Sequence, residues 1–431
     1  MDHPDFRARP YVRRVIDNEL DLLCAGAGAI ALEGAKAVGK TATAAERARV
    51  VFSLENPAVR EAVAAAPSLL QTKGPVLIDE WQHLPASWDV VRRAVDAGVP
   101  AGHYLLTGSA SALNPGTHTG AGRILKLHMR PLSLSERGLE RPSVSLAELL
   151  TGRRGDVGGE SGLTLLEYVD EICGSGFPGI RSLPGRVRRA QLRGYIDRIV
   201  DRDVADLGRE VRNPDGLRRW MAAYSAATST TGSFEKIRDA ATPGEGDKPA
   251  RSTTIPYRDL LERLFVLDPV PAWLPTRNHI KRLSSSPKHH LVDPALAASL
   301  LGMGPETFLR GDQGPVAVPR DGTLLGALFE SLVTQSVRTY AMASEARTGH
   351  FRTHGGDHEV DLIVERPDGR VVALETKLAA TVGSDDTKHL RWLRDHLGSD
   401  LLDAAVITTG RFAYRRPEDG IAVIPASLLG P

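Results

Sequence analysis

Short apolar runs alternate with helical patterns through the first part of the chain. Three runs have the length and composition of buried strands, and the segments between them are rich in helix-forming residues. The predicted strands span residues 28–33, 76–79 and 103–107, and the predicted helices span residues 41–51 and 87–97. Strands that alternate with helices predict a parallel sheet covered on both faces, so we expect a three-layer α/β domain at residues 1–140.

Two glycine-rich, charged stretches interrupt the middle of the chain. Residues 151–162 (TGRRGDVGGESG) and 241–253 (ATPGEGDKPARST) have no hydrophobic period and are predicted to be loops or linkers. Residues 195–211 repeat apolar positions at helical spacing, and residues 257–273 predict an amphipathic helix with a short strand after it. Helices followed by a hairpin suit a winged helix at residues 160–300. A helical connector that does not contact DNA fits the pattern equally well.

A further α/β unit is predicted at residues 320–431. Its pattern gives the order helix, strand, strand, helix, strand. The helices are predicted at residues 322–341 and 385–398, and the strands at residues 358–365, 370–377 and 403–409. An RPDG turn at residues 366–369 joins the first two strands into a hairpin.

The totals limit the classes of protein that the chain can belong to. It has 431 residues, of which 42% are hydrophobic and 25% charged, and its formal net charge is +1. A chain of this length exceeds the size of one hydrophobic core, so about two to four domains are expected. The composition is typical of a soluble globular protein, and the small net charge gives no overall signal for nucleic acid.

Cysteine content and hydropathy predict where the protein works. Cys24 and Cys173 lie far apart without metal-ligand spacing, which argues against a disulfide framework and against a cysteine zinc site. Charges in the N-terminal sequence MDHPDFRARPYVRR replace the apolar centre that a signal peptide needs, and no run reaches the roughly 18 apolar residues that span a bilayer. We therefore expect a cytoplasmic protein with no membrane partner.

A phosphate-loop pattern, GxxxxGK[ST], lies between the first predicted strand and the first predicted helix. It reads GAKAVGKT and is formed by Gly34, Gly39, Lys40 and Thr41. The glycines let the backbone curl so that its N–H groups point at phosphate oxygens. Lys40 is expected to reach the β- and γ-phosphates of a nucleotide, and the Thr41 hydroxyl is expected to ligate Mg²⁺.

An acidic pair ends the second predicted strand. Asp79 is expected to hold Mg²⁺ and Glu80 to orient or deprotonate the attacking water, so the sequence predicts hydrolysis as well as binding. The chain has no NKxD-type guanine-reading motif, which favours ATP over GTP. In LLTGSAS, Thr107 or Ser109 ends the next strand and is a candidate sensor of the γ-phosphate. A hydroxyl at this position is also common as a helix cap.

Arg123 is a candidate arginine finger. It follows Gly120-Ala-Gly in a predicted loop, and an arginine on such a loop can stabilise the charge that develops during phosphoryl transfer. An ordinary surface arginine is the alternative. The sequence leaves open whether Arg123 acts within its own subunit or across the interface of a homo-oligomer.

Several segments resemble a widespread group of prokaryotic AAA-type P-loop ATPases whose C-terminal domain of unknown function has a nuclease-like pattern. The segments are GAKAVGKT, LIDEWQ, LLTGSAS, AGRILKLHMRPLSLSE and GFPG with YIDRIVDRDV, and the resemblance covers most of the chain. It implies the ATP contacts and acids named above, the arginine at Arg123 and a winged-helix segment. Lys36 and Ala37 stand where the group carries arginine and glutamine, and the insertion at 241–253 makes the winged segment atypical.

Carboxylates and a lysine converge on the C-terminal predicted hairpin. A period of two places Glu375 and Lys377 on one face of the second strand, and pairing through the turn brings Asp361 near them. Hard oxygen ligands for Mg²⁺ or Mn²⁺, with an ammonium group close by, are what metal-assisted phosphodiester hydrolysis needs. A charged pair on a solvated face would show the same alternation.

The same residues are similar to the PD-(D/E)xK nuclease superfamily. Asp361 is followed after thirteen residues by Glu375-x-Lys377, and Glu330 matches the acid on the preceding helix of that fold. The resemblance implies a restriction-endonuclease-like α/β domain with metal ligands Glu330, Asp361 and Glu375 and a catalytic Lys377. A domain of this kind can also bind nucleic acid without cutting it. His354, His358 and His389 are interpreted as phosphate or solvent contacts before metal ligands.

Three functional hypotheses follow from these two sites. The first is an ATPase whose nucleotide cycle repositions a nuclease-like domain on DNA or RNA. The second is a regulatory switch whose C-terminal domain docks a partner without cleaving it. The third is an ATP-dependent DNA-binding regulator that acts through the winged segment.

Overall fold

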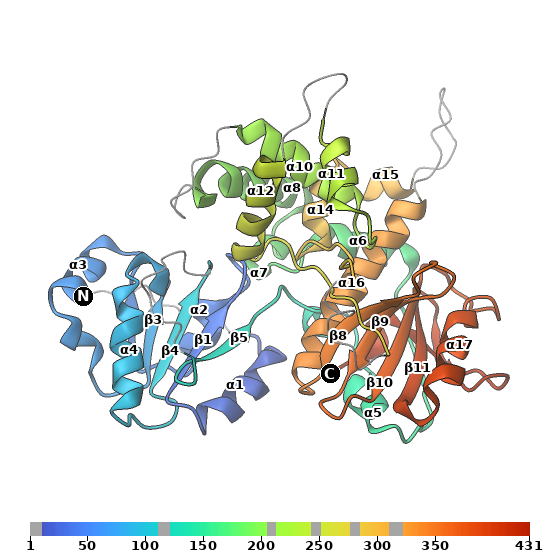
Figure 1. The fold of residues 1–431 in the computed structure, drawn as a ribbon, viewed down its shortest axis with the longest axis horizontal. Coiled ribbons are helices and arrows are strands. Elements are labelled where there is room, and N and C mark those ends of the chain that lie inside the picture. Colours follow the sequence, from blue (N-terminus) through green and yellow to red (C-terminus); the bar gives the residue numbers. More distant parts are fainter. Residues whose placement is uncertain (1–10, 111–120, 205–212, 243–250, 276–284, 310–321) are drawn as a thin grey trace. The chain divides into compact units, whose positions relative to one another are not determined.

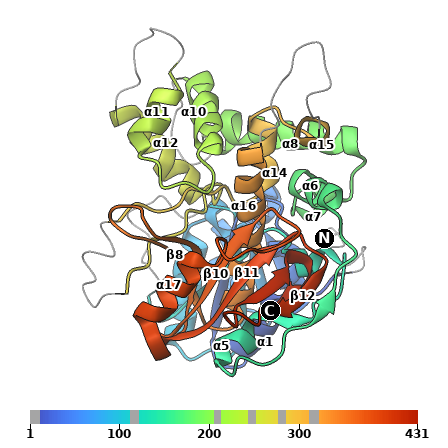
Figure 2. The ribbon, with the colours of Figure 1, turned by 90° about the vertical axis from the view of Figure 1, so that its right-hand side faces the viewer.

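The chain forms two compact units, which are described separately (Figure 1, Figure 2). The computed structural model describes residues 11–110, 121–204, 213–242, 251–275, 285–309 and 322–431. The first unit comprises residues 1–131 and 261–265, and the second comprises residues 132–260 and 266–431.

A five-stranded parallel sheet is the centre of the first unit, and its order is β2-β3-β4-β1-β5. The strands are β1 (Ala29–Glu33), β2 (Val50–Ser53), β3 (Val76–Asp79), β4 (Tyr104–Gly108) and β5 (Leu125–His128). All residues of β1, β3 and β4 are buried, as is typical of parallel strands covered on both faces. The parallel α/β sheet predicted for this part of the chain is confirmed.

Helices follow the strands of this sheet, with one departure from the prediction. They are α1 (Ile16–Cys24), α2 (Lys40–Ala45), α3 (Pro57–Ala65) and α4 (Ala86–Asp96), with 3₁₀ turns at Pro67–Leu70 and Trp81–His83. The helix expected at residues 41–51 ends at Ala45, and β2 begins at Val50. The β-branched pair Val50-Val51 before Phe52 favours a strand over a helix, which explains the error.

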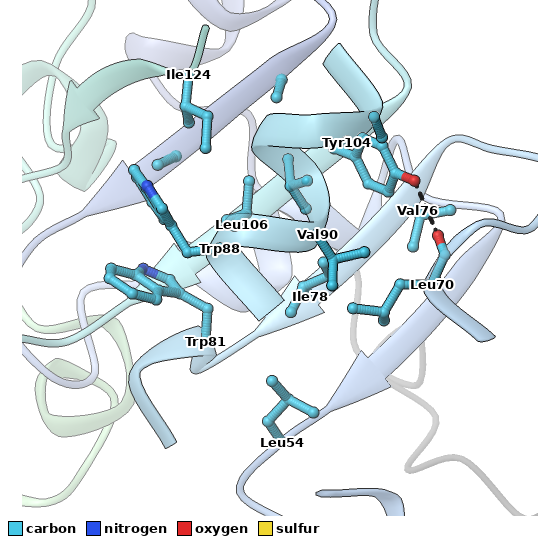
Figure 3. Packing of buried hydrophobic residues seen from close by; sticks show 14 of the residues in the cluster. Leu54, Leu70, Val76, Ile78, Trp81, Trp88, Val90, Tyr104, Leu106 and Ile124 are labelled. Carbon is cyan, nitrogen blue, oxygen red and sulfur yellow. Dashed lines mark hydrogen bonds between the residues drawn. The ribbon is translucent and has the colours of Figure 1, made fainter. Parts of the chain in front are cut away.

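Aromatic residues fix the ends of β3 and β4 (Figure 3). The rings of Trp81 and Trp88 pack with their centroids 4.4 Å apart, next to Ile78 of β3. The Tyr104 hydroxyl donates a hydrogen bond of 3.0 Å to the Leu70 carbonyl. The tryptophan pair thus packs next to the carboxyl end of β3, where the acidic side chains of the candidate site lie, whereas Tyr104 fixes the amino end of β4.

A seven-stranded mixed sheet forms much of the second unit, in the order β7-β12-β13-β11-β10-β9-β8. Its strands are β7 (Gly159–Glu160), β8 (Arg347–Arg352), β9 (Glu359–Glu365), β10 (Val371–Lys377), β11 (Leu401–Thr408), β12 (Phe412–Arg415) and β13 (Ala422–Pro425). Strand β9 runs antiparallel to both of its neighbours, β8 and β10, whereas β11 runs parallel to β10 and to β13. A separate pair joins β6 (Val144–Ser145) to β14 (Leu429–Gly430).

Two helices pack on opposite faces of this sheet, α16 (Gly322–Met342) against β8–β10 and α17 (Lys388–Leu397) against β9–β11 (Figure 1, Figure 2). From α16 to β11 the order is therefore helix, three strands, helix, strand, and β12, β13 and β14 follow. The predicted order lacked these last strands and also lacked β8. This edge strand shows no period of two, because its buried positions include Gly349 and His350. Gly349 is required because a Cβ there would lie 2.8 Å from the Cβ of Trp273.

Helices make up most of the rest of the second unit. They are α5 (Leu146–Thr151), α6 (Leu165–Gly174), α7 (Pro178–Arg181), α8 (Gly185–Arg198), α10 (Pro214–Ala226), α11 (Phe234–Ala240), α12 (Arg251–Arg263), α14 (Pro294–Leu300) and α15 (Pro305–Leu309). After α12, isolated antiparallel bridges pair Leu267 with Leu291 and Val270 with Lys288. The helices α10, α11 and α12 precede this paired segment, which is the order of elements that a winged helix would have. The winged-helix interpretation itself stays a prediction. Within the described ranges, no helix is both long enough and apolar enough to cross a membrane.

The stretch at residues 151–162 is not a free linker. Gly159 and Glu160 form β7 at the edge of the large sheet, where they pair with β12. The Arg154 guanidinium donates to the carbonyls of Leu401 and Leu402 at 3.0 Å each. The sequence pattern did not reveal these contacts, because a strand of two residues and a side chain that binds backbone carbonyls produce no hydrophobic period. Residues 243–250 of the second predicted linker lie outside the described residues.

Candidate functional site

The phosphate loop joins β1 to α2 with the backbone that its glycines allow. Gly34 and Gly39 have φ angles of +155° and +107°, which side chains rarely adopt. A Cβ on Gly34 would also collide with the carbonyl oxygen of Met129. Buried Arg14 supports the loop by donating to the carbonyls of Val38 at 2.9 Å and Arg130 at 3.0 Å. Sequence reasoning missed Arg14, because nothing in MDHPDFRARPYVRR distinguishes it from its arginine neighbours.

Lys40 lies inside the loop, with its ammonium group bonded to the loop itself. Nζ donates to the carbonyls of Gly34 at 2.8 Å and Ala35 at 2.9 Å, and the residue is 4% exposed. Burial lowers the pKa of Lys40 to about 8, although Glu80 and Asp79 favour its charged form. The ammonium group is therefore held by acceptors that a phosphate group could replace.

Asp79 collects hydroxyl groups from three neighbouring segments. Its Oδ1 accepts hydrogen bonds of 2.6 Å from both Thr41 and Thr107, and its Oδ2 accepts one of 3.3 Å from Ser53. Burial raises the pKa of Asp79, and the hydroxyl donors oppose that shift. The structure thus brings together Thr41 and Asp79, the two predicted Mg²⁺ ligands. Their hydroxyl and carboxylate oxygens are the hard donors that this ion prefers.

Glu80 follows Asp79 in a left-handed conformation, with φ of +52°. Its Oε2 accepts a hydrogen bond of 2.6 Å from the Ser109 hydroxyl and another from the Gln82 side-chain amide. Gln82 also donates to Ser109 at 3.1 Å, and the Thr107 hydroxyl accepts from the Glu80 backbone N–H at 3.2 Å. Gln82 was missed as a site residue, although it stands in the quoted segment LIDEWQ. Thr107 contacts both acids, and its role as a γ-phosphate sensor stays a prediction.

Arg123 and the phosphate loop of its own chain lie at opposite ends of the parallel strands. Arg123 is at the amino end, and the loop is at the carboxyl end. Arg123 precedes β5, which starts in register with Ile30, whereas the loop follows Glu33 at the other end of β1. The intervening strand has a length on the order of 15 Å. Arg123 instead donates to Asp96 at 2.8 Å and remains about half exposed. The arrangement does not support action on the nucleotide of its own chain, so action on a neighbouring chain and an ordinary surface ion pair with Asp96 are the two remaining alternatives.

A buried lysine that the sequence gave no reason to select joins the C-terminal carboxylates. Lys288 Nζ lies 2.9 Å from Glu330, 3.0 Å from Asp361 and 3.2 Å from Glu359, and its side chain is 1% exposed. Lys288 is placed by its pairing with Val270, in a segment distant along the chain from the acids. Only the tertiary structure reveals this contact.

The predicted acids and Lys377 do gather around this lysine. Asp361 Oδ2 accepts a hydrogen bond of 2.9 Å from the Thr376 backbone N–H, and Lys377 Nζ lies 3.1 Å from Glu375 Oε1. Glu375 Oε2 is buried and has no partner among the described residues. The predicted convergence of Glu330, Asp361, Glu375 and Lys377 is thus present in the structure, with Lys288 among them.

Burial shifts the protonation of the cluster toward neutral acids. It raises the pKa of Glu330 to about 8, with the Asp361 carboxylate adding to the shift and Lys288 opposing it. Burial and Asp361 also raise the pKa of Glu375 well above its ordinary value. The three acids around Lys288 raise the pKa of its ammonium group, against the effect of burial. The cluster therefore contains two ammonium groups, Lys288 and Lys377, beside two acids, Glu330 and Glu375, whose charged form burial disfavours.

This arrangement does not fit Mg²⁺ or Mn²⁺ at Glu330, Asp361 and Glu375. The Lys288 ammonium group lies at hydrogen-bond distance from two of the three predicted ligands, Glu330 and Asp361, and would repel a divalent cation there. In the described part of the chain, no group of three or more His, Cys, Asp or Glu side chains is placed to hold a metal ion. Lys288 contacts Glu330 and Asp361, two of the three carboxylates that the sequence assigns to metal binding, and Glu375 contacts Lys377 instead.

The nearby histidines pack against aromatic rings. The His358 ring stacks on Trp392 with centroids 4.1 Å apart, and its Nδ1 lies 3.3 Å from Nδ1 of His389. His354 is exposed on the loop between β8 and β9. The role of these three histidines as phosphate or solvent contacts stays a prediction.

Comparison with known proteins divides the chain into three matched segments. Residues 27–138 match a family described as an AAA domain. Residues 166–307 and 325–429 match two domains of unknown function, DUF8612 and DUF4143. Neither of the latter descriptions assigns an activity, so the winged-helix and nuclease-like interpretations stay predictions.

Similar full-length proteins come from mycobacteria and archaea. The uncharacterized proteins Mb2031c of Mycobacterium bovis and Rv2008c of Mycobacterium tuberculosis are each 26% identical over 351 residues, which are 80% of this chain and 67% of theirs. The Walker-type ATPase PABY2304 of Pyrococcus abyssi is 16% identical, with a TM-score of 0.39 over 68% of this chain and 99% of that one. The Aeropyrum pernix ORC2 protein, solved as ADPNP-ADP complexes, is 14% identical, with a TM-score of 0.30 over 69% and 95%.

Nucleotide binding is expected to restore the full charge of Lys40. Its pKa of about 8 lies below the ordinary 10.5 and should rise again when phosphate oxygens surround the ammonium group, so ATP binding at pH 9 should take up protons. Titration calorimetry in buffers of different ionisation enthalpy measures this uptake. ATP itself is fully ionised there, because the last phosphate pKa is about 6. A binding enthalpy that is independent of the buffer at pH 9 would contradict the prediction.

Glu330→Gln is expected to weaken the pH dependence of stability. The Glu330 pKa is raised from 4.5 to about 8 by folding, so its stabilising contribution is complete below pH 4.5 and is lost as the pH rises through 8. The free energy of unfolding of the wild type should fall in that window by up to about 1.4 kcal/mol per pH unit for this one proton. Urea denaturation at several pH values measures the slope. The exposed control Glu345→Gln should keep the wild-type slope, and equal slopes in all three proteins would disprove the assignment.

Proposed function

Residues 27–138 are an AAA-type ATPase domain, and from this premise we propose that the chain is an ATP-hydrolysing switch whose C-terminal domain binds a partner without cutting it. One observation carries the hydrolytic part. Thr41 and Thr107 both donate to Asp79 Oδ1, and Glu80, the next residue, lies in contact with Ser109 and Gln82. The proposed Mg²⁺ ligands, Thr41 at the start of α2 and Asp79 at the end of β3, thus lie next to Glu80, the candidate base.

Each residue of the loop has a defined part in holding ATP. Backbone N–H groups of the loop and the start of α2 bind phosphate oxygens, and the Lys40 ammonium group exchanges the carbonyls of Gly34 and Ala35 for the β- and γ-phosphates. Thr41 and Asp79 would hold Mg²⁺, which neutralises phosphate charge when bound. Lys40 gives up two weakly charged acceptors for strongly charged ones, so the exchange favours binding.

Glu80 is proposed to orient and deprotonate the attacking water. Its Oε2 accepts hydrogen bonds from Ser109 and Gln82, which hold the carboxylate in one orientation. Ser109 is a positioning residue in this scheme because it acts on the carboxylate and not on the nucleotide. Gln82 donates hydrogen bonds to both Glu80 and Ser109. A change at the γ-phosphate that moves Glu80 would therefore also move Ser109, the residue that follows β4.

Arg123 is proposed to act on a neighbouring subunit. Its position before β5 keeps it from the phosphates of its own chain, and its half-exposed contact with Asp96 leaves it accessible to a second copy. An arginine supplied by another chain would stabilise charge during phosphoryl transfer. This proposal requires a homo-oligomer in the ATP-bound state.

The C-terminal part of the proposal rests on Lys288. Its ammonium group satisfies Glu330 and Asp361 from within the same unit. A buried ion pair of this kind fixes the arrangement of the segments that contribute to it. The domain then serves as the docking element of the switch. Its partner is either a nucleic acid or a protein.

Glu80→Gln should abolish hydrolysis and leave binding intact. The amide cannot accept a proton from water, and loss of a general base lowers turnover by about 10²- to 10⁴-fold. Phosphate release measures turnover, and fluorescent-ATP titration measures affinity. The exposed Glu55→Gln should behave as the wild type. If Glu80→Gln turned over ATP at the wild-type rate, Glu80 would not be the general base. The phosphate loop is tested separately by Lys40→Ala, which is expected to lose ATP binding.

The switch proposal predicts no cleavage of nucleic acid. Plasmid and single-stranded substrates are incubated with the full chain in Mg²⁺ or Mn²⁺, with and without ATP, beside Lys377→Ala as a control for contaminating nuclease. Intact substrates under all conditions, together with ATP hydrolysis, are the expected result. Cleavage by the wild type that is lost in Lys377→Ala would overturn the proposal in favour of the nuclease hypothesis.

A further inference from the structure

A cavity of about 540 Å³ in the second unit lies apart from both sites described above. It is formed where the carboxyl end of α6 and one face of α8 meet α14 and α15. Its polar lining consists mainly of arginines from α8, with one acid from α6 and one from α15. The residues concerned are Arg188, Arg189, Arg193, Asp170 and Glu306. Its volume is in the range of sites that bind small molecules.

The three arginines of the cavity have no counter-ion at salt-bridge distance in the described part of the chain. No described side chain forms a salt bridge with Arg188, Arg189 or Arg193, and Arg188 Nε is buried with no hydrogen-bond partner. By contrast, the nearby Arg137 and Arg181 both bind Glu171, at 2.9 and 2.6 Å. A buried guanidinium nitrogen without an acceptor is unfavourable unless a ligand supplies one.

The amino end of α8 adds positive charge to the same place. Gly185 begins this 14-residue helix and lines the cavity, and its N-cap Pro184 provides no side-chain hydrogen bond. The first turn contains no acidic residue and carries Arg186 in its place. Helix amino ends favour anions, so positive side chains there oppose the helix dipole. This local conflict would be relieved by a bound anion.

We propose that this cavity binds a small phosphorylated molecule of about mononucleotide size. Its phosphate would contact Arg188, Arg189 and Arg193, whose planar guanidinium groups match phosphate geometry. Asp170 and Glu306 would accept hydrogen bonds from hydroxyl or amino groups on the rest of the ligand. A continuous phosphate backbone fits less well, because these two carboxylates would repel it.

Cys173 also lines the cavity but adds no chemistry. Burial raises the pKa of its thiol to about 12, so the reactive thiolate is scarce at neutral pH. The site is therefore assigned to binding alone.

The test uses inorganic pyrophosphate and AMP as probes in full-length protein carrying Lys40→Ala. This background disables the phosphate loop, so the result does not depend on the proposed ATPase function. Titration calorimetry should show binding of the probes, weakened by at least about tenfold when Arg189→Glu is added, as expected for loss of a charged phosphate contact. Arg198→Glu is the matched control, because it makes the same charge change at the carboxyl end of the same helix, outside the cavity, and it should retain binding within about twofold.

Three results would overturn the proposal. They are no binding of either probe, equal loss in Arg189→Glu and Arg198→Glu, and binding of a single-stranded oligonucleotide that depends on Arg189 without binding of either probe. Circular dichroism melts establish that each variant folds. If Arg189→Glu fails to fold, Arg193→Gln, which removes an exposed cavity arginine without reversing charge, replaces it in the same comparison.

Discussion

Asp79 Oδ1 is the atom on which the nucleotide site depends. It accepts hydrogen bonds from Thr41 at the start of α2 and Thr107 at the end of β4, while Oδ2 faces Ser53 of β2. One carboxylate thus joins three separate strands to the phosphate loop. The aromatic packing behind it, with Trp81 against Trp88, determines where the strand ends lie. The parallel sheet, the loop and the acids therefore form one mechanical unit, in which displacement of Asp79 is transmitted to each element that it binds.

The sequence could predict this unit because its residues are close in sequence to the elements that position them. GAKAVGKT and LIDE each combine a buried strand with the polar residues at its end, so local pattern and tertiary position coincide. Arg14 and Lys288 could not be found in this way, since each acts on residues that lie far along the chain. The strand β8 escaped notice for a related reason. Its buried glycine and histidine are explained only by the segment that packs against them.

Charge compensation distinguishes the two clusters of the second unit. At Lys288 the protein supplies both signs, and the acids are neutralised by a cation from a distant segment. Around α8 the protein supplies mainly one sign and leaves Arg188 without an acceptor among the described residues. The first cluster pairs its charges within the protein, whereas the second leaves a guanidinium group that an anionic ligand could pair. Residue types alone would have suggested the reverse, because the acids match a metal-binding pattern and the arginines match none.

The pairing of β7 with β12 bears on where the chain can be divided. Residues 159–160 supply the edge of the sheet whose other strands come from residues 347–425. A fragment beginning near residue 320 would expose β12 as a bare edge, with the already protruding Phe412 upon it. Such edges recruit strands from other molecules. The same cut would remove Lys288 and leave Glu330 and Asp361 without their counter-ion. Proteolytic excision at this boundary would thus yield an aggregating remnant and not an autonomous module.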